Sequence, residues 1–168
     1  MEHEHAAHGK QANQHGHSGH YFRLLVMMGL SFLAMYALMY AMVDRFANVY
    51  GSVNQAWMAG LMASPMLVIE LLVMGGMYPD KKRNALLIVG GIAAMIVFWV
   101  LIRQQTAVTE RQFLRSMIPH HAGAILMCEE RKGRDGAEVQ ALCAEILASQ
   151  RNEIRRMKAL LDDESRTP

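Results

Sequence analysis

The sequence predicts an all-α protein in which three membrane-spanning helices precede a soluble pair of helices. Three observations predict this class. Apolar residues make up 52% of the 168-residue chain and concentrate in three long segments, a polar histidine-rich stretch precedes these segments, and two amphipathic stretches separated by a glycine-containing turn follow them. The soluble part has roughly 60 residues, too few for a large independent core.

Residues 1–20 are polar and rich in histidine. They lack the apolar periodicity of a packed element, so we expect a disordered tail. The closely spaced pairs His3/His5 and His15/His17 suit a loose, unstructured site for copper, zinc or nickel.

The three apolar segments lie at residues 21–43, 56–78 and 85–102, which together make a three-span region over residues 21–103. A helix of roughly 20 residues crosses the hydrocarbon core, and lipid leaves helix as the form for such single segments. Trp99 and Arg103 suit the interface at the end of the third span.

The short loops predict the orientation of the spans. Residues 79–84, "PDKKRN", contain three basic residues, whereas residues 44–55 contain only Arg45. The positive-inside rule therefore places the 79–84 loop and the N-terminal tail in the cytoplasm. We expect a bacterial inner (cytoplasmic) membrane protein whose residues 104–168 lie in the periplasm or outside the cell.

Residues 104–168 read as a helical hairpin. After a polar connector at 104–110, Thr109 followed by Glu110 marks a helix start, and "KGRDG" at 132–136 is the expected turn. A second helix is predicted over residues 137–161 from apolar residues at helical spacing.

The first helix gathers unusual side chains on one face. In "FLRSMIPHHAGAILMCEE" (113–130), five residues fall within about a third of the helical circumference at 100° per residue. This face is also apolar, so it should point toward the second helix, where an imidazole needs a hydrogen-bond partner or a metal. The five residues are Met117, His120, His121, Met127 and Cys128.

The second helix carries a matching row. Cys143, Gln150 and Met157 recur every seven residues, and Glu153 lies within a turn of two of them. In an antiparallel pair that turns near residue 134, Gln150 and Glu153 should lie beside Met117–His121. Met157 should lie farther toward the membrane end.

Thioether, imidazole and thiol are soft or borderline ligands, a set that favours Cu(I) and, by the same chemistry, silver. Zinc is a further possibility, although it prefers sites without methionine. The alternative is that the methionines only fill the core. Cys128 and Cys143 are additional candidate ligands, but a disulfide or two small buried residues explain them as well.

The second span carries Met58, Met62, Met66, Glu70 and Met74 at strict spacing of four, in a chain with 15 methionines. One hypothesis is a thioether relay for Cu(I) along the membrane, with Glu70 as counter-charge. The other is that methionine packs here in place of leucine and that Glu70 makes a hydrogen bond.

The stretches "FLRSMIPHHAGAILM" and "EILASQRNEIRRMKALL" make residues 113–161 resemble the DUF305 family of small, ferritin-like helical proteins. The histidine-rich start and three spans resemble its membrane-anchored branch. The resemblance implies copper binding and tolerance, with metal roles for Met117, His120, His121, Met127 and Met157, and also for Gln150 and Glu153. Relatives with two such units form four-helix bundles, so this single unit should pair as a homo-oligomer.

We therefore expect a membrane-anchored copper-binding protein for buffering, tolerance or hand-off at the outer face, with periplasmic copper proteins as candidate partners. The alternatives are a metal-relay transporter and a structural or regulatory membrane protein without metal. We expect no enzyme, because no nucleophile with a base, paired carboxylates or phosphate loop is evident. The net charge of +2 indicates no nucleic-acid partner.

Overall fold

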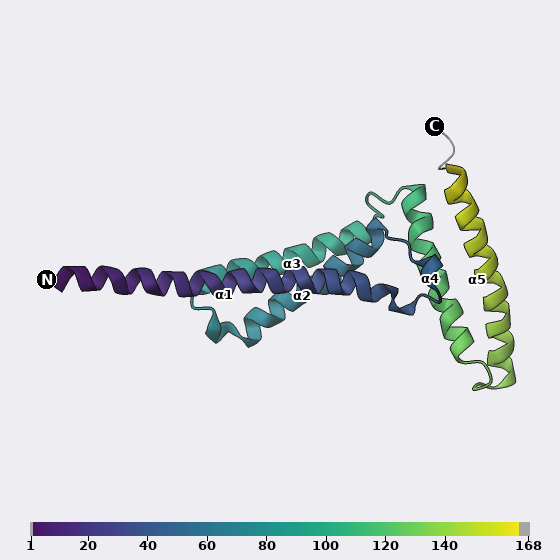
Figure 1. Cartoon of the computed structure of the whole chain (residues 1–168), viewed down its shortest axis with the longest axis horizontal. Helices are drawn as coiled ribbons and strands as arrows, with labels where there is room; N and C mark the ends of the chain where they lie inside the picture. Colours follow the sequence, from purple (N-terminus) through teal and green to yellow (C-terminus); the bar gives the residue numbers. More distant parts are fainter. Residues whose placement is uncertain (1, 165–168) are drawn as a thin grey trace. The chain divides into compact units, whose positions relative to one another are not determined.

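The computed structural model describes residues 2–164, with side chains placed for residues 19–163, and the regular elements in that range are helical. Figure 1 shows them along the chain. The α-helices are α1 (Glu2–Leu38), α2 (Val53–Val73), α3 (Lys81–Arg103), α4 (Glu110–Glu130) and α5 (Ala137–Glu164), with short 3-10 turns at η1 (Met39–Met42), η2 (Phe46–Asn48) and η3 (Gly75–Met77).

The chain divides into two compact units, each described separately. The first unit holds the chain up to Met35 together with Trp57–Arg103, and the second holds Tyr36–Ala56 together with the chain from Gln104 onward. The predicted all-helical class is confirmed for the described residues.

Three helical segments are long and apolar enough to cross a membrane, as predicted. They are Gly19–Met42, Val53–Val73 and Lys81–Arg103, with mean hydropathies of 2.0, 1.8 and 2.8. The second starts three residues earlier and ends five residues earlier than the predicted 56–78, because a 3-10 turn follows at Gly75–Met77. The third starts earlier than predicted, at Lys81, because Asp80 accepts from the backbone N–H groups of Lys82 and Arg83 at 3.0 Å and caps the helix.

Small residues let α2 and α3 approach closely in the first unit. A Cβ atom at Gly60 would lie 2.6 Å from the ring of Phe98, and one at Gly91 would lie 3.0 Å from Val68. Glycine, alanine and serine at such contacts are typical of membrane helices, which gain most from close packing.

Residues 2–20 form part of α1, whereas the sequence predicted a disordered tail there. The first span supplies a formed helix, and extending a formed helix adds one hydrogen bond for each residue fixed. No proline interrupts residues 2–38, and each glycine among them costs only about 1 kcal/mol relative to alanine. The side chains of residues 1–18 lie outside the described residues.

In the second unit, α4 and α5 run side by side in opposite directions (Figure 1). The predicted start of α4 is confirmed, because the side chain of Thr109 accepts from the backbone N–H of Gln112 at 3.3 Å. The turn includes Gly133 with φ of +77°, a left-handed conformation that favours glycine. The second helix starts at Ala137 as predicted and continues to Glu164, three residues past the predicted end.

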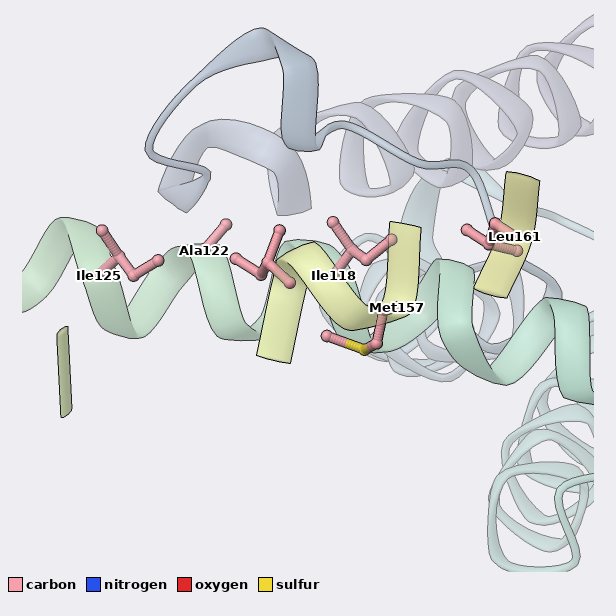
Figure 2. Close-up of a cluster of buried hydrophobic side chains, with 6 residues drawn as sticks. Ile118, Ala122, Ile125, Met157 and Leu161 are labelled. Atoms are coloured by element: carbon pink, nitrogen blue, oxygen red, sulfur yellow. The ribbon is translucent and has the colours of Figure 1, made fainter. Parts of the chain in front are cut away.

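Three segments of the chain, rather than the two helices alone, form the core of this unit. Buried apolar side chains of α4 and α5 meet (Figure 2), and the segment Tyr36–Ala56 contributes Val43 and Tyr50 to the same cluster. Gly123 faces this segment, and a Cβ atom there would lie 3.6 Å from the carbonyl oxygen of Met42, an ordinary van der Waals distance. The central members are Ile118, Ala122, Ile125, Ile154, Met157 and Leu161.

Candidate metal site

The five chemically distinctive residues of α4 do not share one environment. Cys128 is buried, Met117 and His121 are half-buried, and His120 and Met127 are exposed, Met127 with 55% of its surface. The prediction that all five point toward the partner helix is therefore wrong for His120 and Met127. The buried arc of α4 is centred on Ile118, Ala122 and Ile125, because the helix packs against both α5 and the segment Tyr36–Ala56.

His121 lies at the centre of the group that the fold does bring together. Its Nδ1 atom is 2.8 Å from the carbonyl oxygen of Met117, and its Nε2 atom is 2.7 Å from Oε2 of Glu153. A carbonyl oxygen only accepts, so Nδ1 carries a proton and donates to Met117. The contact between Nε2 and the carboxylate of Glu153 is a hydrogen bond when Nε2 carries a proton, and a metal ion binding at Nε2 would take the place of that proton.

Glu153 is the cross-helix neighbour of His121 that the antiparallel register predicted. Its other carboxylate oxygen accepts from the hydroxyl of Ser149 at 2.7 Å. The hydrogen bond from Ser149, followed by that from His121, lowers the pKa of Glu153 below its ordinary value of 4.5. Gln150, the other predicted neighbour, is half-buried one turn before. Sequence reasoning missed Ser149, although its position four residues before Glu153 places both on one helix face.

Two thioethers belong to the same region. Met117 is one turn before His121 and Met157 is one turn after Glu153. Met157 belongs to the buried cluster of this unit (Figure 2), and the partly buried Met117 packs against that cluster. Met157 is only 9% exposed. The structure thus places an imidazole, a carboxylate and two thioethers on neighbouring turns of α4 and α5.

His120 extends to the exterior beside this group. Its ring centroid is 6.1 Å from that of His121, and the two ring planes are inclined by 65°. Phe113 and Met127, seven residues before and after His120, are also exposed. These three side chains therefore form an exposed row along α4.

Cys128 and Cys143 form a disulfide, with 5.3 Å between their Cα atoms. The sequence left a disulfide and a metal role open for this pair. With the two sulfur atoms bonded to each other, neither is a thiolate available as a ligand. The disulfide instead joins α4 to α5 next to the turn.

The row of methionines that follows α2 from Met58 to Met74, one residue past the helix end, lies mainly at the exterior of the first unit. Met58, Met62 and Met74 are exposed, whereas Met66 is half-buried. Glu70 is half-buried and accepts from the hydroxyl of Tyr78 at 3.4 Å. This placement agrees with methionine as an apolar surface residue of a span.

The histidines of the N-terminal tail, His3, His5, His15 and His17, have side chains outside the described residues. Within residues 19–163, no three histidine, cysteine or acidic side chains are arranged to hold a metal ion. His121 and Glu153 alone supply two side-chain ligands from these residue types.

A family model described as "Domain of unknown function (DUF305)" matches residues 89–161. The chain is 30% identical over 145 residues to "Uncharacterized protein L153" of Acanthamoeba polyphaga mimivirus, an alignment that covers 83% of this chain and 91% of that protein. No solved structure matches significantly.

Proposed function

This chain belongs to the DUF305 family, and we propose that it is a membrane-anchored protein that binds Cu(I) and buffers it or hands it on at the outer face of a bacterial inner membrane. The observation that carries the proposal is the position of His121. Its ring is held between α4 and α5, with Glu153 at 2.7 Å and the thioethers of Met117 and Met157 on the adjacent turns. Imidazole with thioether is a ligand set for Cu(I), and silver fits the same set.

The proposed topology places the unit with α4 and α5 outside the cytoplasm. Two features support it. The loop with Lys81, Lys82 and Arg83 favours the cytoplasmic side, and three spans then put the C-terminal unit on the other side. The disulfide of Cys128 and Cys143 agrees with an oxidising compartment such as the periplasm, where copper proteins that exchange metal with this chain would be found.

A homo-oligomer is part of the proposal. The exposed row Phe113, His120 and Met127 on α4 has a counterpart on α5, whose exposed apolar side chains occupy positions of one heptad series. A second copy covering these rows would complete a four-helix bundle and enclose His120 and Met127. The residues on α5 are Val139, Leu142 and Leu160.

The test uses the chain without residues 2–18 but with all its other segments, in detergent, because Val43 and Tyr50 of the segment Tyr36–Ala56 are part of the core that α4 and α5 require. Cu(I) is titrated against a competing chelator. Residues 2–18 are removed so that the histidines of the tail bind none of the Cu(I). We expect His121→Ala and Met157→Leu each to weaken Cu(I) binding at least tenfold. Met157→Leu nearly conserves volume, so the fold should tolerate it.

Matched substitutions separate the neighbouring hypotheses. Met58→Leu in α2 should leave the affinity unchanged, and loss of binding in that variant would favour the membrane relay instead. Met127→Leu should weaken binding only under conditions where the chain is oligomeric, because Met127 is exposed within a single chain.

One observation favours a second candidate, a structural membrane protein without metal. Both ring nitrogens of His121 already have hydrogen-bond partners, so the ring is satisfied by the protein alone. Equal, weak Cu(I) binding by the parent chain and by His121→Ala, together with a lower melting temperature of the variant, would support this candidate and contradict the first.

A further inference from the structure

A second site lies in the same unit, and its lining includes neither His121 nor Glu153. A cavity of about 290 Å³ separates the segment Asp44–Asn48 from α5. Four of its lining side chains are basic and one is acidic, so the lining carries a net charge of +3. The basic residues are Arg45, Arg151, Arg155 and Lys158, and the acidic residue is Asp44.

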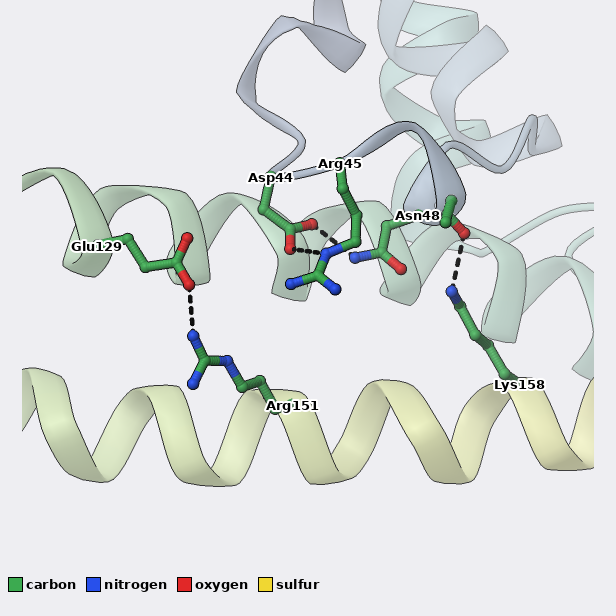
Figure 3. A network of polar contacts seen from close by, with 7 residues as sticks. Asp44, Arg45, Asn48, Glu129, Arg151 and Lys158 are labelled. Atoms are coloured by element: carbon green, nitrogen blue, oxygen red, sulfur yellow. Dashed lines mark hydrogen bonds and ion pairs between the residues drawn. The ribbon is translucent and has the colours of Figure 1, made fainter.

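Two of the four cations are paired with carboxylates (Figure 3). Asp44, whose side chain is only 2% exposed, lies 2.8 Å from Nε of Arg45 and also accepts from Asn48. Arg151 forms an ion pair with Glu129, which does not line the cavity. These ion pairs hold the side chains of Arg45 and Arg151 in the cavity wall. The carboxylate of Asp44, the one acidic side chain of the lining, is already paired with Arg45.

The other two basic side chains, Lys158 and Arg155, donate hydrogen bonds to uncharged oxygen atoms. Lys158 donates to the carbonyl oxygen of Ala47 at 2.8 Å (Figure 3). Its ammonium nitrogen also lies 5.8 Å from the ring centroid of Tyr50. Arg155 donates to Oδ1 of Asn152 at 3.3 Å. The cavity therefore keeps an excess of positive charge, with donors suited to an oxyanion.

An exposed phenylalanine stands on the same short turn. Phe46 is 95% exposed, and its chain neighbours Arg45 and Ala47 both line the cavity. The segment follows directly after the first candidate span, which ends at Met42. An aromatic side chain four residues past a span, next to basic residues, is well placed to enter the bilayer interface.

We propose that this cavity binds the phosphate group of an anionic phospholipid, with Phe46 inserted between the acyl chains beside it. Lys158 and Arg155 contact the phosphate oxygens, while Asp44 and Arg45 hold the turn in position. The lipid pins the Asp44–Asn48 turn, and α5 with it, to the membrane surface. This inference is independent of the proposed metal function, because none of its residues is a candidate metal ligand.

The test measures lipid binding to the full chain in detergent by native mass spectrometry, with phosphatidylglycerol as the probe. The double variant Arg155→Gln/Lys158→Gln should bind this lipid about thirtyfold more weakly, since each basic residue near a lipid surface contributes about a factor of five. The control Arg134→Gln/Arg156→Gln removes two charges outside the cavity and should bind as the parent does. Equal weakening in both double variants would show only general attraction and would overturn the proposal.

Two further arms identify the source of the phosphate. Inorganic phosphate at millimolar concentration should not displace the lipid, and displacement would assign the cavity to a soluble anion instead. Phe46→Ser should weaken lipid binding, whereas Phe113→Ser, which changes another exposed phenylalanine of the same unit, should not. An unchanged lipid affinity in Phe46→Ser would refute the insertion of this side chain. Far-ultraviolet circular dichroism confirms that each variant retains its helix content.

Discussion

Removing the disulfide between α4 and α5 tests the packing of the second unit most directly. Cys128 and Cys143 are 15 residues apart in the chain, and closing a loop of this length reduces the entropy of the unfolded chain. The loop-closure relation gives a stabilisation of about 3 kcal/mol. In Cys128→Ala/Cys143→Ala, the equilibrium for opening this unit should shift by about 150-fold.

Hydrogen exchange followed by mass spectrometry is a suitable assay, because it reports opening separately for each peptide of the full chain. Peptides covering the buried stretch Ile118–Ile125 should lose about 150-fold in protection, whereas peptides of α3 should not change. The parent chain treated with a reductant is the matched control and should behave as the double variant does. A loss below about fivefold, in a parent chain whose disulfide is verified by mass, would refute the loop-closure reasoning.

Two further predictions address the first unit and the turn. Gly60→Ala should destabilise the helices of the first unit by about 1–3 kcal/mol, because the added Cβ atom would lie 2.6 Å from the Phe98 ring. The control is Gly90→Ala, whose Cβ atom would meet nothing within 4 Å. Thermal unfolding in detergent should show a lower melting temperature for the first variant than for the second. The hydrogen bond from Arg131 holds the pKa of Asp135 below its ordinary value of 3.8. The pair therefore stabilises the folded state fully above pH 3.8, and this contribution is lost as the pH falls through the lowered pKa of Asp135. Arg131→Gln should return the pKa of Asp135 to about 3.8 in a carboxyl NMR titration, and an unchanged pKa would contradict this account.

Local patterns predicted the elements well because each pattern acts within a few residues. The lengths of the apolar segments predicted three helices able to cross a membrane, and Thr109 predicted the start of α4 through its side-chain hydrogen bond. The charges and glycines of residues 132–136 predicted the turn. The predicted end of α2 was less accurate, because the helix ends five residues before the apolar segment does and the 3-10 turn η3 at Gly75–Met77 follows it.

The candidate metal site was predictable only in part. Helical periodicity placed Met117, His121 and Glu153 correctly with respect to one another, since an antiparallel register follows from the position of the turn. It failed for His120 and Met127, because a helix packed on two neighbours buries an arc whose centre the helix alone does not define. The segment Tyr36–Ala56 moved that centre toward Ile118.

The sequence by itself determined that this chain is helical, that three of its segments are long and apolar enough to cross a membrane, and that its chemically distinctive side chains lie on α4 and α5. These properties follow from hydrophobic length and from periodicities of about 3.6 residues, which the backbone imposes locally. Only the tertiary structure decided that Cys128 is bonded to Cys143 and that Lys158 donates to the loop at Ala47. Contacts between distant segments depend on how two or three apolar surfaces pack together, and no single segment encodes that choice.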